Sequence, residues 1–230
     1  MKTVKFTLIG LILIFVGCSS PVNRADTDCN GVNSTNKNAV LLKDFPTLQQ
    51  NEDYTCGNIS ALMVIRFFGD SSETESGLAQ KMHTHTDSNT PNAKPGSATK
   101  WTDYVTNVEE IYNYFNNKNY RIVSSSYNSK NELLTDTSLV GIQAVGNKQS
   151  EFADYGEAAK FFAENIKHNR PVMVCWNAWG GHWTVCIGYD DNGTADFFDD
   201  DVLTMADPYD TTDGIKDGYT KVSLVQFFYD

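Results

Sequence analysis

The segment from Thr55 to Phe68 restricts most strongly how this chain can fold. It reads Thr-Cys-Gly-Asn-Ile-Ser-Ala-Leu-Met-Val-Ile-Arg-Phe-Phe, and Gly69 follows as a helix stop. At helical spacing, apolar side chains point in nearly every direction. A helix that is apolar nearly all round has to be buried, so other segments must contribute a core that surrounds it. The segment therefore predicts a buried helix inside a folded domain.

The composition agrees with one sizeable domain. Of the 230 residues, 40% are hydrophobic and 20% are charged, which is typical of a globular protein rather than a disordered one. The formal net charge is −11. Such an acidic balance disfavours nucleic acid as a partner, and it disfavours electrostatic docking on anionic lipid.

The N-terminal residues have the pattern of an export signal. Lys2 and Lys5 precede an apolar run over residues 6–16, which is too short to cross a bilayer as a helix. The following Val16-Gly17-Cys18 resembles the lipobox of bacterial lipoproteins, in which the cysteine becomes the lipid-bearing first residue. Cys18 is therefore the expected lipidation site. The alternative is an ordinary signal peptide followed by a coincidental cysteine.

This pattern divides the chain into three expected parts. Residues 1–17 are a lipoprotein signal peptide, residues 18–38 are a flexible tether rich in small polar residues, and residues 39–230 are the folded domain. A lipid anchor would hold the domain on a membrane of the bacterial cell envelope. Whether the domain faces the periplasm or the cell surface stays open.

Within the domain, helical and strand patterns occupy different halves. Periodicity and turn signals define the elements. The expected helices are 55–68, 73–83, 101–117, 152–168 and 224–228, and the expected strands are 39–45, 121–125, 172–176, 183–189 and 202–206. Helices dominate the first half and strands the second, which predicts an α+β domain.

Cys56 stands at the start of the buried helix and precedes Gly57. A cysteine is a strong nucleophile only as the thiolate, and a helix N-terminus stabilises that anion. Gly57 is expected to leave room for a substrate. Taken alone, however, Cys56 is better explained as a small buried hydrophobic residue, so a catalytic role needs support from other residues.

His182 follows Gly180 and Gly181 and opens a predicted buried strand. An imidazole at a strand end can deprotonate a thiol and later protonate a leaving amine. A core histidine with both nitrogens satisfied is the alternative. Asp207 follows another predicted strand, where its carboxylate could orient the imidazole, although Asp-Pro is also a common turn.

Gln50 lies six residues before Cys56, in a polar loop that enters the helix. Its side-chain amide could act with the backbone N–H of Cys56 as a donor to an oxyanion. A glutamine in such a loop carries no weight alone. Each of these residues becomes a catalytic candidate because all four occur in the order Gln50, Cys56, His182 and Asp207.

These segments resemble a known family. Residues Gln50-Asn51-Glu52-Asp53-Tyr54-Thr55-Cys56-Gly57, with Ala61 to Gly69 after them, are similar to the nucleophile block of the double-glycine-leader (bacteriocin-processing) peptidases and their stand-alone relatives. The segment Gly181 to Tyr189 is similar to the histidine block of that family, and Ala206-Asp207-Pro208 to its aspartate block. The resemblance extends from about Phe45 to the C-terminus.

The resemblance implies a papain-like fold with a triad of Cys56, His182 and Asp207, and Gln50 in the oxyanion hole. It also implies a peptide or protein substrate, cleaved at peptide or related amide bonds through a thioester, with no cofactor and no metal. The sequence departs from the family at Asn58, where many relatives have proline. Three aspartates inserted at 199–201 lengthen the path from His182 to Asp207.

Two other polar clusters are interpreted as solvent-exposed residues that neither catalyse a reaction nor bind a metal. The run His83-Thr84-His85-Thr86-Asp87 has no second cluster at metal-site spacing, and the aspartates near 200 lack the ligand order of a calcium loop. Cys175 and Cys186 flank a predicted hairpin in which they would face each other. They are interpreted as packed core thiols, with a disulfide as the alternative.

Three functions are compatible with this pattern. The leading hypothesis is a cysteine peptidase in the bacterial envelope. A transglutaminase-like acyl transferase would use the same triad with an amine in place of water. The third is a catalytically silent peptide-binding module on the same scaffold, which a large separation of His182 from Cys56 would favour.

Overall fold

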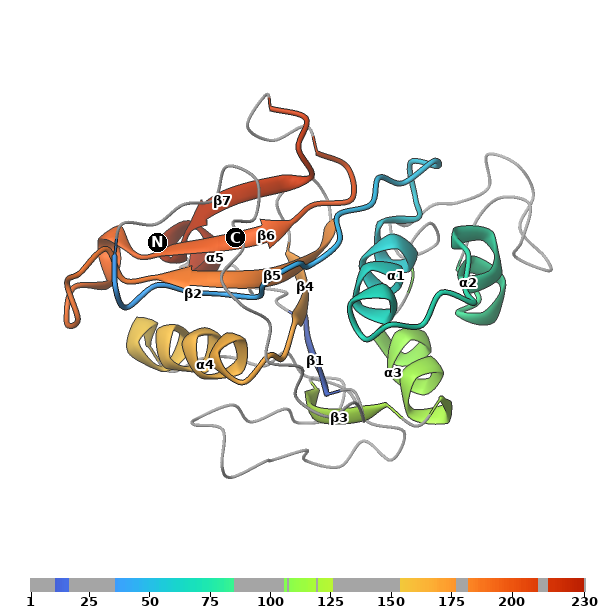
Figure 1. Cartoon of the computed structure of the whole chain (residues 1–230), viewed down its shortest axis with the longest axis horizontal. Coiled ribbons are helices and arrows are strands. Elements are labelled where there is room, and N and C mark those ends of the chain that lie inside the picture. Colours follow the sequence, from blue (N-terminus) through green and yellow to red (C-terminus); the bar gives the residue numbers. More distant parts are fainter. Residues whose placement is uncertain are drawn as a thin grey trace, which may run out of the picture.

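The structure is a computed structural model in which one group of helices lies beside an antiparallel sheet and other helices pack along that sheet (Figure 1). The prediction of an α+β domain is confirmed. The residues that the structure describes are 11–16, 36–84, 106, 108–118, 120–125, 154–176, 182–210 and 215–229. Almost all of the first part of the helix expected over 101–117 lies outside them.

The first half supplies three helices, which Figure 1 shows grouped together: α1 (Cys56–Phe67), α2 (Glu75–Lys81) and α3 (Val108–Asn117). Every residue of α1 from Cys56 to Ile65 is buried, which confirms the central helix that the sequence predicts. Gly69 follows it with φ +90°, a left-handed conformation that costs little only for glycine.

The second half supplies most of the sheet. Its successive strands are antiparallel neighbours, so short connections suffice between them. They are β4 (Val172–Trp176), β5 (His182–Asp190), β6 (Val202–Ala206) and β7 (Tyr219–Ser223), and the short β2 (Val40–Leu41) pairs with the far end of β5. Helices α4 (Tyr155–Lys167) and α5 (Leu224–Tyr229) complete this half.

Helix α4 confirms the helix predicted over 152–168, and most of its apolar side chains are buried. Ala158, Ala159, Phe161, Phe162 and Ile166 are all buried, and α4 contacts β5 (Figure 1). Asp154 caps the helix, because its side chain accepts a hydrogen bond from the backbone N–H of Glu157 at 2.9 Å.

The strand β7 was not predicted. It alternates between buried and more exposed positions, with Thr220 and Val222 buried, and it pairs with β6 alone at one edge of the sheet. The final helix begins after Ser223 as expected, since the Ser223 hydroxyl accepts a hydrogen bond from the backbone N–H of Gln226 at 3.0 Å.

Residues Leu11–Val16, which the sequence assigns to a signal outside the fold, form a strand (β1) in the structure. It lies between β4 and β3 (Arg121–Ser125) and pairs antiparallel with both. An apolar run rich in branched residues has high strand propensity, and β4 offers it backbone partners. Removal of residues 1–17 stays a prediction. No helix among the described residues is long and apolar enough to span a membrane.

The hairpin between β4 and β5 does not pair Cys175 with Cys186. The register sets Cys175 opposite Trp183 and Cys186 opposite Val172. The expected pairing assumed a turn centred near residue 180, whereas the observed register is centred one to two residues earlier. Both cysteines are buried free thiols, as the interpretation of packed core thiols requires.

Candidate active site

Cys56 is the first residue of α1, and its side chain is buried. Thr55 occupies the N-cap, but its hydroxyl makes no capping hydrogen bond to the helix. The unsatisfied N–H groups of a first helical turn favour a negative charge beside them. The local structure therefore suits a cysteine that reacts as the thiolate.

His182 and Asp207 meet at one end of the sheet. His182 is the first residue of β5, and Asp207 directly follows its neighbour β6. Imidazole Nε2 lies 2.7 Å from Asp207 Oδ1, and both side chains are largely buried. The pairing of adjacent strands thus joins two residues that lie 25 positions apart in the sequence.

Cys56 is the second partner of His182. The Cys56 side chain interacts with the imidazole and helps to raise the pKa of His182. Because Nε2 is bonded to Asp207, Nδ1 is the nitrogen that remains for Cys56. The structure therefore brings together the three residues of the predicted triad, with the histidine between the thiol and the carboxylate.

The surroundings of His182 favour the charged imidazolium. Burial lowers the pKa of His182, but the hydrogen bonds and charges of Asp207 and Cys56 together outweigh burial. As a result the pKa of His182 rises from 6.5 to about 9. An imidazolium at neutral pH is the partner that a thiolate requires.

Gln50 lies beside the aspartate segment. Its backbone N–H donates to the carbonyl of Pro208 at 2.8 Å, and the side chain of Gln49 donates to the carbonyl of Asp207 at 3.1 Å. The Gln50 side-chain amide donates to the carbonyl of Glu52 at 2.8 Å. The loop before α1 thus reaches the site, with the Gln50 amide held within its own loop.

Gly57 serves packing rather than access for a substrate. A Cβ atom on this residue would lie 2.8 Å from Thr106 Cβ and 3.1 Å from Trp183 Cδ1, distances too short for carbon atoms. The expectation that Gly57 leaves room for a substrate is therefore wrong. Its missing side chain lets α1 approach β5 and the Thr106 segment closely.

Hydrogen bonds connect the two halves directly beneath Cys56. The Ser60 hydroxyl donates to the carbonyl of Trp183 at 3.1 Å, and Trp183 Nε1 donates to the carbonyl of Thr106 at 3.0 Å. Asn58, where many relatives have proline, is buried and accepts from the hydroxyls of Thr84 and Thr106 at 2.9 and 3.3 Å. These contacts fix the nucleophile helix against the histidine strand.

Tyr209 belongs to the site, although sequence reasoning missed it. Its backbone N–H donates to Asp207 Oδ1 at 2.9 Å, and its ring centroid lies 6.4 Å from that of His182. Tyr209 remains 47% exposed, so it lies at the surface beside the buried imidazole. An aromatic residue two positions after the aspartate was the available signal.

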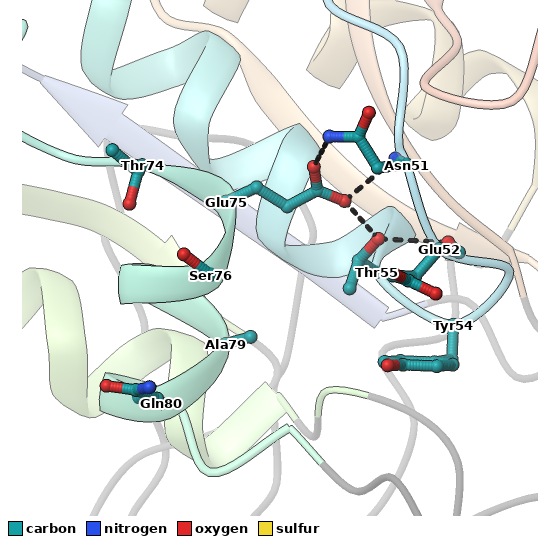
Figure 2. A pocket seen from close by; sticks show the side chains of 9 residues that line it. All are labelled: Asn51, Glu52, Tyr54, Thr55, Thr74, Glu75, Ser76, Ala79 and Gln80. Atoms are coloured by element: carbon teal, nitrogen blue, oxygen red, sulfur yellow. Dashed lines mark hydrogen bonds between the residues drawn. The ribbon is translucent and has the colours of Figure 1, made fainter.

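A hollow of about 440 Å³ opens beside the loop that precedes Cys56 (Figure 2). None of its described lining residues is basic. They are Asn51, Glu52, Tyr54, Thr55, Thr74, Glu75, Ser76, Ala79 and Gln80. In Figure 2 the carboxylate of Glu75 points from the start of α2 toward Asn51 and Thr55.

Among the described residues, no group of three histidine, cysteine, aspartate or glutamate side chains is arranged to hold an ion, and His85 and Asp87 lie outside those residues. His83 Nδ1 instead contacts Glu110 at 2.9 Å. Cys18 and Cys29 lie outside the described residues.

Comparison with protein families matches residues 42–229 to the Peptidase_C39 like family. The chain belongs to this family. Membership of the Peptidase_C39 like family implies cysteine peptidase activity and a peptide or protein substrate, and the α+β structure agrees with the papain-like fold of such peptidases. Comparisons with curated proteins and with solved structures gave no match.

Proposed function

We propose that this member of the Peptidase_C39 like family hydrolyses peptide or amide bonds with a Cys56–His182–Asp207 triad. The observation that carries the proposal is the position of His182, whose Nε2 is hydrogen-bonded to Asp207 while the Cys56 side chain helps to raise the pKa of the imidazole. This contact also argues against a silent binding module, for which a separated cysteine and histidine were the expected sign.

The reaction needs only groups of this chain and water. His182 takes the proton of Cys56, and the sulfur attacks the carbonyl carbon of the scissile bond. The resulting oxyanion would be stabilised by the Cys56 backbone N–H and the Gln50 amide, once that amide leaves the Glu52 carbonyl. His182 then protonates the leaving amine, and a thioester forms.

The second half of the cycle releases the acid. His182 accepts a proton from water as the water attacks the thioester carbon, and Cys56 leaves as the thiolate. Asp207 orients the imidazole and balances its positive charge, as an aspartate does in other triads. The exposed ring of Tyr209 would limit the access of water to the His182–Asp207 hydrogen bond.

Peptide digestion tests this proposal. The full chain, purified in detergent, is incubated with a diverse peptide mixture, and the products are identified by mass spectrometry. We expect new fragments ending in a free carboxylate, no such fragments from Cys56→Ser, and unchanged cleavage by Cys186→Ala, which removes a buried thiol outside the site. Absence of any difference between wild type and Cys56→Ser would contradict the proposal.

The same digestion separates hydrolysis from acyl transfer when a small primary amine is added in excess. Hydrolysis gives fragments with carboxylate ends, whereas acyl transfer gives fragments extended by the amine. We expect carboxylate ends to dominate even with the amine present. A product pool made mainly of amine adducts would favour the transglutaminase-like alternative.

We further propose that Cys18 carries a lipid that holds the peptidase on a membrane of the bacterial envelope. The lipobox-like Val16-Gly17-Cys18 and the polar segment after it support this placement. Cells expressing the full chain are fed an alkyne fatty acid, and the purified protein is probed for label. We expect label on wild type and none on Cys18→Ser; equal labelling of both would contradict the anchor.

A further inference from the structure

Glu75 makes an unusual set of contacts for the first residue of a short helix. Its Oε1 accepts hydrogen bonds from the backbone N–H of Asn51 at 2.9 Å and from the Thr55 hydroxyl at 2.5 Å. Its Oε2 accepts from the side-chain amide of Asn51 (Figure 2). One carboxylate therefore binds both ends of the loop 51–55.

That loop connects the two groups on which the proposed chemistry depends. Gln50 directly precedes Asn51, and Cys56 directly follows Thr55. The loop has no regular structure of its own, and its backbone is closed internally by the Thr55 N–H donating to the Glu52 carbonyl at 3.2 Å. Its shape therefore depends strongly on the contacts that Glu75 provides.

The contact with Glu75 also explains the missing cap of α1. The Thr55 hydroxyl donates to Glu75 and to the carbonyl of Glu52 instead of accepting from the helix. The first N–H groups of α1 thus receive no side-chain cap from Thr55. Such groups lie next to Cys56, where they favour a thiolate and an oxyanion.

Glu75 does not pair with a cation in the hollow, since none of the described lining residues is basic. Its donors are uncharged groups of a single loop. Helix α2 itself is fixed by buried Leu78 and Ala79, so the carboxylate is presented from a packed element. These features describe a support for the loop rather than a surface ion pair.

We infer that Glu75 is a positioning residue, which sets the placement of the Gln50 amide relative to the Cys56 sulfur through Asn51 and Thr55. The inference rests on the proposed peptidase function and extends it. Displacement of a catalytic group by about 1 Å can cost about 10²-fold in rate, and loss of an oxyanion donor costs about 10²–10³-fold. Loosening the loop should therefore affect oxyanion-dependent steps selectively.

Two reagents test this inference. Both react with the Cys56 thiolate, but only one of them forms an oxyanion in the reaction. Iodoacetamide alkylates sulfur by displacement of iodide and forms no oxyanion. p-Nitrophenyl acetate acylates the same sulfur through an oxyanion and releases p-nitrophenolate as a burst. The ratio of acylation rate to alkylation rate at Cys56, with the labelled residue mapped by mass spectrometry, reports placement of the oxyanion donors.

We expect Glu75→Ala to lower this ratio at least tenfold, mainly through acylation. Glu75→Gln should restore most of it, because its amide oxygen still accepts from Asn51 N–H and Thr55, and the Asn51 amide can turn to pair with the new NH₂. Gln80→Ala, an exposed side chain on the same helix and the same hollow, is the matched control and should leave the ratio unchanged.

Three results would overturn the inference. Equal losses in both reactions would show a general structural role, and unchanged rates in Glu75→Ala would show no role. If Glu75→Ala does not fold, Thr55→Val removes one of the three bonds with little change in shape, and an unchanged ratio there contradicts positioning. Wild type that shows no activated Cys56 with either reagent would instead refute the peptidase function itself.

Discussion

The two halves of this protein position catalytic residues by different means. In the sheet half, His182 and Asp207 are joined by the backbone pairing of β5 with β6. In the helical half, Cys56 and Gln50 depend on side chains that bridge irregular segments, such as Glu75 binding the loop 51–55. Strand register is fixed by many repeated bonds, whereas a loop support can fail through one substitution.

This difference has a practical consequence. The His182–Asp207 pair should persist through most surface substitutions, while the placement of Cys56 should respond to single changes between the halves. Removing contacts of each kind tests this expectation, and the contacts of Trp183, which join the two halves, come first.

Trp183 joins both halves and should give the largest effect on stability. It is 2% exposed, and it bonds the Thr106 carbonyl while its own carbonyl accepts from Ser60. We expect Trp183→Ala to lower the free energy of unfolding by about 3–5 kcal/mol, measured by urea denaturation. Trp183→Phe keeps much of the apolar contact but loses the N–H donor, so it should cost about 1–3 kcal/mol.

Equal costs for Trp183→Ala and Trp183→Phe would contradict this account, because they would mean that packing beneath the nucleophile helix contributes nothing beyond one hydrogen bond. A cost below about 1 kcal/mol for both variants would mean that Trp183 does not hold the halves together.

The sheet half can be probed through the pH dependence of stability. The folded pKa of His182 is raised from 6.5 to about 9, so its stabilising effect is complete below pH 6.5 and is lost as pH rises through about 9. We expect wild type to lose at most about 3 kcal/mol over this window. Asp207→Asn removes a main cause of the raised pKa and should flatten the curve; parallel curves would contradict the assignment.

Glu73 offers the corresponding probe of the helical half, with a smaller effect. Its carboxylate is 4% exposed and binds Lys81 Nζ at 2.6 Å and Lys118 Nζ at 3.4 Å, and its backbone carbonyl accepts from Arg66 at 3.0 Å. Burial raises the pKa of Glu73, but the bonds from Lys81 and Tyr114, together with the lysine charges, lower it more. We expect Glu73→Gln to cost about 2 kcal/mol at pH 7.

The sign of this second pH dependence is opposite to that of His182. Because the folded pKa of Glu73 is lowered from 4.5, its contribution is present above that pH and is lost as pH falls further. Wild type and Glu73→Gln should therefore converge in acid. Glu164→Gln, on an exposed ion pair with Lys167 at 3.9 Å, is the control and should change stability by under about 0.5 kcal/mol.

Periodicity in the sequence predicted the elements that are long or strongly patterned. The burial of α1 followed from its apolar residues on every face, and the inward face of α4 from its three- and four-residue spacing. The strand β7 was missed because it sits at a sheet edge, where its partly exposed residues give only a weak apolar pattern. The strand β1 was assigned to an export signal, whose apolar run has the same composition as a buried strand.

The site divides in the same way. Cys56, His182 and Asp207 could be proposed because each sits at the start or end of a patterned element. The contacts of Glu75 with Asn51 and Thr55 lie 20 and more residues apart in the sequence and follow no period. The crowding around Gly57 involves Thr106 and Trp183, so it emerges only when α1 and β5 are packed together.

The most direct test of the central claim is the rate at which iodoacetamide alkylates Cys56 at pH 6.5, in wild type and in His182→Ala. A thiol with the reference pKa of about 8.5 is only about 1% ionised at this pH. Pairing with the His182 imidazolium should therefore make wild type react about tenfold to a hundredfold faster than the variant. Slow labelling spread over Cys175 and Cys186, and indifferent to His182, would contradict a thiolate–imidazolium pair.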